Sequence, residues 1–222
     1  MAKLHAGMVA GGTCFMALEQ TAGKGQRGRT WIVEPGVNIT MTTVLQPPVY
    51  ERFLYSAVMA LACYDFIKGF GINEVSVKWP NDIYIGDRKA AGILIENIQQ
   101  GTHWQWAVAG TGINLNQLEF PADLSRAISV AQATGRQHDL ISSARILHLH
   151  ILRRNEWAKV ASAAEIMNEY NTVLYRRNES VRLKKDAAVF STVIKEVTAS
   201  GELITYDTME RRFTVGEVEF IG

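Results

Sequence analysis

The sequence predicts an α+β fold, with a mixed, mainly antiparallel sheet, flanking helices and a small C-terminal β-barrel. Three observations lead to this prediction. Residues 74–113 contain three strand-like runs joined by connections too short for the crossovers that parallel strands require. Residues 50–70 and 140–173 carry apolar residues at helical spacing. After Asn178, short runs rich in Thr and Val replace both patterns, which is typical of a small barrel.

The first part of the chain predicts two strands and a helix. Residues 12–18 resemble a strand, and residues 38–45 alternate between two faces with period two until Pro47 ends the run. Residues 50–70 have the apolar spacing of a core-facing helix, which Gly69 closes.

The remaining elements follow from turn signals and periodicity. Gly86-Asp87 and Gln99-Gln100-Gly101 are the turns that separate the strand-like runs of the antiparallel sheet. Residues 140–173 predict one long helical region. We expect two domains, residues 1–177 and 178–222, packed together because no low-complexity linker separates them.

Composition excludes several classes of protein. The chain has 222 residues, 47% of them hydrophobic, which supplies a core and excludes a disordered chain or a disulfide scaffold. Lys plus Arg number 23 and Asp plus Glu number 22, so the chain lacks the basic excess of a DNA-binding domain. With only Cys14 and Cys63, no signal peptide and no membrane-spanning apolar run, we expect a cytoplasmic protein that binds neither DNA nor membrane.

The densest cluster of chemistry-bearing residues is the loop GKGQRGRTW, residues 23–31. Its glycines let backbone amides approach an anion, and Lys24, Arg27 and Arg29 would neutralise the charge. The loop is not a dinucleotide fingerprint, because no helical pattern opens at its glycines. It is not a P-loop, because Gly25 follows Lys24 where Ser or Thr is needed. We interpret it as an exposed phosphate-binding loop, and a solvated basic turn is the alternative.

Three other segments carry candidate site residues. In KWPND, Lys78 suits a phosphate or carboxylate, Asn81 can orient a ligand, and Asp82 can bind Mg²⁺ through oxygen. In KAAGILIE, Lys89 stands at the start of an apolar strand, where an ammonium group would stabilise developing negative charge. Asn114 follows a Gly-Thr-Gly strand end, and its amide can bridge ligand oxygens. An ordinary turn after proline and a strand-end lysine are the structural alternatives.

Taken in order, GKGQRGRTW, KWPNDIY, KAAGILIE and GTGINLN resemble the catalytic region of the biotin protein ligases. The resemblance implies a class II synthetase-like catalytic domain followed by an SH3-like barrel. In this family biotin and Mg-ATP form biotinyl-5'-adenylate, and the activated carboxyl group passes to a lysine of a biotin carboxyl carrier protein, part of acetyl-CoA carboxylase or a related carboxylase. The implied substrates are therefore biotin and ATP, with Mg²⁺. No N-terminal DNA-binding domain is expected within these residues, and homodimer formation stays open.

The resemblance also implies roles for the matching residues. The implied catalytic residues are Lys89, Arg29 and Asp82, with Asp82 also the implied Mg²⁺ ligand. The implied biotin contacts are Gln20, Lys24, Gly25, Gln26 and Lys89. The implied ATP and adenylate contacts are Arg27, Arg29, Trp31, Lys78, Asn81, Asp82 and Asn114.

The sequence departs from the family pattern in two places. Met1 to His5 contain no counterpart of the Ser-Thr-Asn motif that holds the biotin ring, and Lys24 and Gln26 stand where many members have arginine. Two alternative functions stay open: a lipoate or octanoyl acyltransferase of the same fold, and a protein that binds biotin or its adenylate without catalysis. The GKGQRGRTW and KWPND motifs favour the ligase over the acyltransferase.

Overall fold

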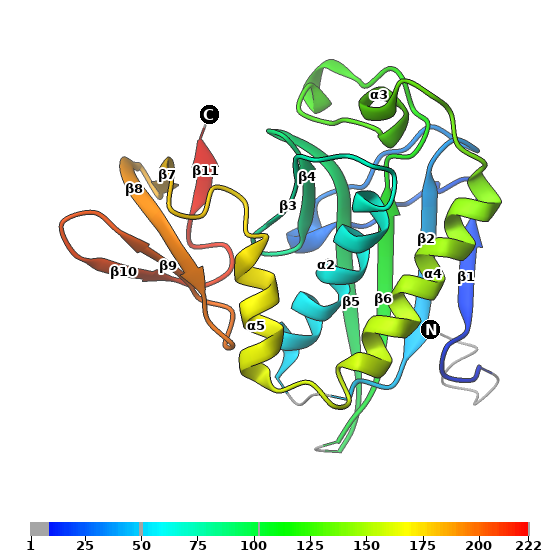
Figure 1. The fold of residues 1–222 in the computed structure, drawn as a ribbon, viewed down its shortest axis with the longest axis horizontal. Helices are drawn as coiled ribbons and strands as arrows, with labels where there is room; N and C mark the ends of the chain where they lie inside the picture. Colours follow the sequence, from blue (N-terminus) through cyan, green and yellow to red (C-terminus); the bar gives the residue numbers. More distant parts are fainter. Residues whose placement is uncertain (1–8, 49–50, 102, 222) are drawn as a thin grey trace.

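Two antiparallel sheets organise the chain in the structure, a computed structural model that describes residues 9–48, 51–101 and 103–221 (Figure 1). Helices pack against the first sheet, and the second, smaller sheet is C-terminal. The predicted α+β fold is confirmed, and a small, all-antiparallel sheet stands where the C-terminal barrel was predicted. None of the helices in the described ranges has the length and apolar character needed to cross a bilayer. Met1 to His5, where the Ser-Thr-Asn motif was sought, lie outside the described residues.

The first sheet has six strands in the order β1-β2-β6-β5-β4-β3. Its strands are β1 (Cys14–Ala17), β2 (Ile39–Leu45), β3 (Val75–Lys78), β4 (Asp82–Ile85), β5 (Arg88–Gln100) and β6 (His103–Ile113). Every neighbouring pair is antiparallel. Tight turns join β3 through β6 in succession, and such short connections permit only antiparallel pairing there. The sheet is therefore wholly antiparallel, whereas a mixed sheet was expected. The parallel contacts of Val77 with Leu174, Lys89 with Ala127 and Arg177 with Ile194 are isolated bridges outside the named strand pairs.

The segment 74–113 contains four strands, where the sequence predicted three. The missed boundary is the turn Trp79-Pro80-Asn81 between β3 and β4. Pro80 has no amide hydrogen to donate to a strand ladder, so the chain reverses there. As a result, Lys78 and Asp82 become cross-strand partners at the mouth of this turn.

Two helices lie across one face of the first sheet, α2 (Arg52–Lys68) and α4 (Leu140–Trp157) (Figure 1). Helix α2 is buried on nearly all sides, because it packs against the sheet, α4 and α5 (Ala163–Thr172). The predicted helical region 140–173 is broken between α4 and α5, and α5 begins anew with a capping box formed by Ser162 and Glu165. A short helix that the sequence did not predict, α3 (Val130–Thr134), follows β6.

The second sheet has five strands in the order β10-β9-β8-β7-β11. Its strands are β7 (Ser180–Lys185), β8 (Ala188–Val197), β9 (Leu203–Tyr206), β10 (Glu210–Phe213) and β11 (Glu219–Ile221). Trp79 joins it to the first sheet, since its indole Nε1 donates a hydrogen bond of 3.0 Å to the carbonyl of Gly201. Gly201 has a φ of 89° and lies against the ring of Phe53 in α2, so its turn accepts no larger residue.

A buried hydrogen bond couples α2 to α4. The Tyr55 hydroxyl donates to Asn155 Oδ1 at 2.6 Å, and Tyr55 is fully buried. We expect Tyr55→Phe to lower the free energy of unfolding by about 1–3 kcal/mol, because the buried amide oxygen loses its donor. Urea denaturation measures this loss. Tyr64→Phe on the same helix is the control, since its half-buried hydroxyl makes no hydrogen bond in the described part of the chain; an equal loss in both variants would contradict the prediction.

Candidate active site

The face of the first sheet opposite the helices carries two glycines that leave room for an aromatic ring. Gly92 in β5 and Gly112 in β6 are direct cross-strand partners. The indole of Trp31 lies over both: a Cβ placed on Gly92 would be 3.1 Å from the ring, and one placed on Gly112 would collide with it. The pair therefore forms a glycine floor that seats Trp31 against the sheet.

The glycine-rich loop that precedes Trp31 is folded as a small hairpin. Lys24 and Thr30 form a β-bridge, the Gly25 amide donates to the Arg29 carbonyl at 2.7 Å, and the Trp31 amide donates to the Gly23 carbonyl at 3.0 Å. The predicted biotin contacts on this hairpin are exposed or half-exposed: Gln20, Lys24, Gly25 and Gln26. The hairpin thus carries polar side chains at the surface beside the glycine floor.

Both arginines of this loop reach the second sheet. Arg27 Nη1 donates to the carbonyl of Gly216 at 2.8 Å, and Arg29 Nη2 lies 3.6 Å from Glu219 Oε1. All of these side chains are at the surface, so the Arg29 to Glu219 ion pair is worth little on its own. The ion pair matters because it shows that the end of the C-terminal sheet lies at the rim of the site.

Lys89 and Asp82 form the central ion pair. Lys89 Nζ lies 2.7 Å from Asp82 Oδ1 and 5.6 Å from the centre of the Trp31 ring. Asp82 Oδ1 is buried and accepts no hydrogen bond within the described residues, so the contact is an ion pair without hydrogen-bond alignment. Two backbone hydrogen bonds fix Lys89: its amide donates to the Arg126 carbonyl at 2.7 Å, and the Ile128 amide donates to the Lys89 carbonyl at 2.9 Å. A fixed backbone holds the ammonium close to the glycine floor.

Lys78 is the second lysine of the site. Its Nζ donates to the Tyr84 hydroxyl at 3.0 Å. Burial lowers the pKa of Lys78 to about 8; the Asp82 carboxylate opposes this shift, and the charges of Arg126, Lys89 and Arg29 add to it. Four cationic side chains therefore act on the space around one carboxylate. Such an excess of positive charge suits a ligand with several negative charges, such as a polyphosphate.

Asn81 and Asn114 hold the backbone around this cluster. Asn81 Nδ2 donates to the Ile93 carbonyl at 2.6 Å, and the buried Asn114 Nδ2 lies 3.3 Å from the carbonyls of Lys89 and Ile128. The structure therefore brings together Trp31, Lys78, Asp82 and Lys89, with both asparagines supporting them. A direct contact of either asparagine with a nucleotide stays a prediction.

Sequence reasoning did not single out several residues that contribute to the site. Arg126 carries no motif, and Glu219 lies almost two hundred positions from the loop that it contacts. Gly92 and Gly112 stand in the motifs KAAGILIE and GTGINLN, but the sequence did not show that they pair with each other beneath Trp31.

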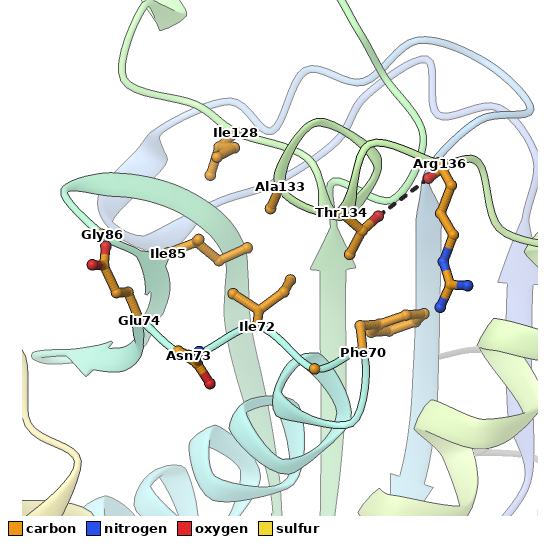
Figure 2. A pocket seen from close by; sticks show the side chains of 11 residues that line it. Phe70, Ile72, Asn73, Glu74, Ile85, Gly86, Ile128, Ala133, Thr134 and Arg136 are labelled. Carbon is orange, nitrogen blue, oxygen red and sulfur yellow. Dashed lines mark hydrogen bonds between the residues drawn. The ribbon is translucent and has the colours of Figure 1, made fainter.

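An open cavity of about 690 Å³ lies elsewhere on the molecule. Figure 2 shows it between the end of α2, the β4–β5 turn and α3, with Phe70, Ile72, Ile85 and Ile128 on its walls. None of the residues predicted for the site lines it. Its walls bring only Glu74 and Arg136 as charged side chains, so the chemistry concentrates at the glycine floor instead.

Comparison with known proteins decides the family. Residues 5–114 match the model of the Biotin/lipoate A/B protein ligase family. The biotin–[acetyl-CoA-carboxylase] ligase of Paracoccus denitrificans is 38% identical to the chain, over 99% of this chain and 94% of the relative. The chain belongs to the biotin protein ligase family.

Two further members of the biotin protein ligase family place this chain among its relatives. The bifunctional ligase/repressor BirA of Bacillus spizizenii is 35% identical over 58% of this chain, and the match spans only 41% of that relative's length. The biotin protein ligase of Aquifex aeolicus, solved in complex with biotin and ATP, superposes with a TM-score of 0.82 at 23% identity, over 96% of this chain and 90% of the other. This second similarity shows that both chains share one fold.

Proposed function

We propose that the protein is a biotin–protein ligase. It would activate biotin with ATP to biotinyl-5'-AMP and then transfer biotin to a lysine of a biotin carboxyl carrier protein. The observation that carries the proposal is the ion pair of Lys89 with Asp82 beside the glycine floor, with Lys78 as the cross-strand partner of Asp82, in a chain of this family. The proposal includes a division of the chain into two domains at residues 177/178, which the start of β7 at Ser180 supports.

The charge around Lys89 fits the chemistry of adenylation. A biotin carboxylate oxygen would bond to the α-phosphorus of ATP as the bond to pyrophosphate breaks, which brings two anions together and leaves charge on the phosphoryl oxygens. An ammonium that is already held in place offsets that charge without reorganisation. In the second step the carrier amine attacks the activated carboxyl carbon, AMP leaves, and the amine loses a proton. Lys89 is therefore assigned to the phosphoryl oxygens.

The loop and the glycine floor would bind different parts of the two substrates. Trp31 is proposed to support the adenine side, and Gln20 with the hairpin residues Lys24, Gly25 and Gln26, all exposed or half-exposed, are proposed to face biotin. Arg27 and Arg29 would meet the phosphate once the adenylate forms. Asn81 and Asn114 would act chiefly by holding the strands that carry Lys89.

Mg²⁺ would enter this site with ATP. Among the described residues, no group of three or more His, Cys, Asp or Glu side chains is arranged to hold a metal. Asp82 offers one carboxylate, and Mg²⁺ accepts a single protein carboxylate when phosphate oxygens and water complete its six ligands. The residues present therefore fit Mg²⁺ only as part of a nucleotide complex, in which the ion would offset phosphate charge.

The decisive experiment measures both half-reactions. With the purified protein we expect pyrophosphate release that depends on biotin and ATP, and avidin-detected labelling of a carrier domain. Lipoate and octanoate are supplied in parallel. Carrier labelling by these acids and never by biotin would select the acyltransferase, and biotin binding without pyrophosphate release would select a binding protein without catalysis.

Replacing both loop arginines, Arg27 and Arg29, with alanine should speed dissociation of biotinyl-5'-AMP by roughly 10- to 150-fold while changing biotin dissociation by about twofold or less. Biotin alone lacks the phosphate that these cations would neutralise. Stopped-flow competition measures both rates. Arg153→Ala on α4 is the matched control, because this exposed arginine lies outside the site. Equal acceleration for both ligands would contradict the assignment.

A further inference from the structure

Three aromatic rings from three separate segments surround the Lys78 ammonium. Its Nζ lies 4.5 Å from the ring centre of Tyr84 in β4, 5.6 Å from that of Tyr175 after α5, and 4.7 Å from that of Phe220 in β11. At such distances an aromatic ring attracts a cation through its quadrupole. We call these three rings the Lys78 cage.

The cage is a built arrangement of mutually packed rings. Tyr84 and Tyr175 are 5.1 Å apart between ring centres, and Tyr175 and Phe220 are 6.3 Å apart. Tyr175 is anchored at both ends: its amide donates to the Val77 carbonyl at 2.9 Å, and its hydroxyl donates to Asp87 Oδ1 at 2.8 Å. The first sheet and its flanking segment thus supply two fixed walls, and the second sheet supplies the third.

The segment that supplies the third wall also holds the glycine-rich loop. Within five residues, Gly216 accepts from Arg27, Glu219 pairs with Arg29, and Phe220 covers Lys78. Three cations of the site therefore depend on one short piece of the C-terminal sheet. Lys78, which Phe220 contacts, is the cross-strand partner of Asp82, and Asp82 pairs with Lys89.

We propose that Phe220 is a positioning residue for adenylation, through which the C-terminal sheet holds the Lys78 ammonium in place beside Asp82 and Lys89. The inference rests on the proposed ligase function and deepens it. Phe220 is assigned no contact with either substrate. Phe220 acts through Lys78, so variants of the two residues, made singly and together, can test whether the effect of Phe220 depends on Lys78.

The electrostatic surroundings explain why Lys78 needs the rings. The ionisable groups that face it are Asp82 and Tyr84 from β4, Lys89 from β5, Arg126 before α3, Arg29 from the loop and Tyr175 after α5. Of these, the Asp82 carboxylate and the Tyr84 hydroxyl, which accepts a hydrogen bond from Lys78 Nζ, favour the charged lysine. Burial and three cations oppose it and bring the pKa of Lys78 to about 8, so its charge disappears as the pH rises from about 7 to 9. Aromatic faces are the other groups that stabilise the buried ammonium.

The test replaces the ring and preserves apolar bulk. Phe220→Leu should lower the rate of biotin-dependent pyrophosphate release at saturating biotin by about two- to thirtyfold, with the dissociation constant for biotin within about twofold of wild type. The alkaline fall of the rate should move to lower pH, because the charged lysine has lost a stabilising partner. Phe220→Tyr keeps the ring and should retain the rate and profile. Phe190→Leu is the control within the same sheet, since Phe190 packs on Phe213 and not on Lys78.

A double-mutant cycle distinguishes an effect of Phe220 on Lys78 from a general loss of stability. In a Lys78→Met background, Phe220→Leu should change the residual rate by less than about twofold, because the partner is gone. If Phe220→Leu lowers the melting temperature, Phe220→Met takes its place. Equal rates and pH profiles for Phe220→Leu and wild type would overturn the inference, as would the same loss of rate in the Lys78→Met background.

A measurement independent of activity keeps the inference distinct from the proposed function. Acetic anhydride labels neutral amines, so mass spectrometry of the Lys78 peptide across pH 6–10 follows the charge on Lys78 even in a protein that releases no pyrophosphate. The labelling midpoint should be lower in Phe220→Leu than in wild type. An unchanged midpoint would refute the cage, whereas a wild-type protein without biotin-dependent pyrophosphate release would refute only the ligase function.

Discussion

Replacing Lys89 with alanine is expected to slow biotin-dependent pyrophosphate release by about 10- to 150-fold, the effect of losing one charge-assisted contact in the transition state. The side chain is one-third exposed and points its ammonium at Asp82, so it contributes more to the charge of the site than to packing. We therefore expect the thermal unfolding midpoint to change little. Single-turnover measurement of pyrophosphate release, with calorimetry in parallel, distinguishes the two effects.

The matched control for this substitution is Lys159→Ala, an exposed lysine just after α4 whose ammonium pairs with Glu156 at 2.7 Å, away from the site. It should release pyrophosphate at the wild-type rate. A Lys89→Ala protein that keeps the wild-type rate would remove Lys89 from the adenylation step. A large fall in melting temperature would instead make the ion pair with Asp82 a structural feature.

Gly112→Ala is expected to have a comparably large effect without touching any charged group. The added methyl would collide with the Trp31 indole, which must then leave the glycine floor. Displacement of a positioning group by about 1 Å can cost on the order of 100-fold in rate. We expect KM for ATP to rise more than the dissociation constant for biotin, since Trp31 is assigned to the adenine side. Steady-state kinetics at varied ATP, with biotin binding by calorimetry, provide the comparison.

Gly110→Ala tests whether this loss comes from Trp31 or from the strand. It lies two residues earlier on the same face of β6, where the nearest atom to an added Cβ is the Leu94 carbonyl oxygen at 3.3 Å. The Trp31 ring is not among its neighbours within 4 Å, so the rate should stay near that of wild type. If both variants lose activity equally, alanine in β6 disturbs the strand whether or not it contacts Trp31, and the proposed role of Trp31 is refuted.

Local clusters of the site were readable from the sequence. The loop arginines, Lys78, Asp82 and Lys89 each stand within a short segment whose composition departs from the strand pattern around it. Charged residues and glycines in such a segment do not pack into the hydrophobic core, so their presence indicates a ligand-binding site. The structure joins the clusters by antiparallel pairing of β3, β4 and β5.

Contacts between distant segments were not readable. The Lys78 cage needs Phe220, and the loop contact needs Glu219, yet neither residue differs in pattern from its neighbours in a short strand. Helical periodicity alone merged α4 and α5 into one region. The signal for the break was nevertheless present, because Ser162 followed three residues later by Glu165 is the spacing of a capping box.

The hydrogen bond from Trp79 to Gly201 bears on how the chain can be cut for use as a split reporter. A fragment that ended before the second sheet would uncover the Trp79 indole and the Phe53 ring, whose partners lie in the turn at Gly201. The Asn171 amide, which binds both polar atoms of the Val197 backbone, would be uncovered with them. Each half would then carry apolar surface and unpaired polar groups into solution, and self-association would compete with reassembly. A cut at the exposed turn between β7 and β8 would separate the same pairs, because Trp79 and Asn171 precede it while Gly201 and Val197 follow it. The two sheets are therefore expected to behave as one cooperative folding unit.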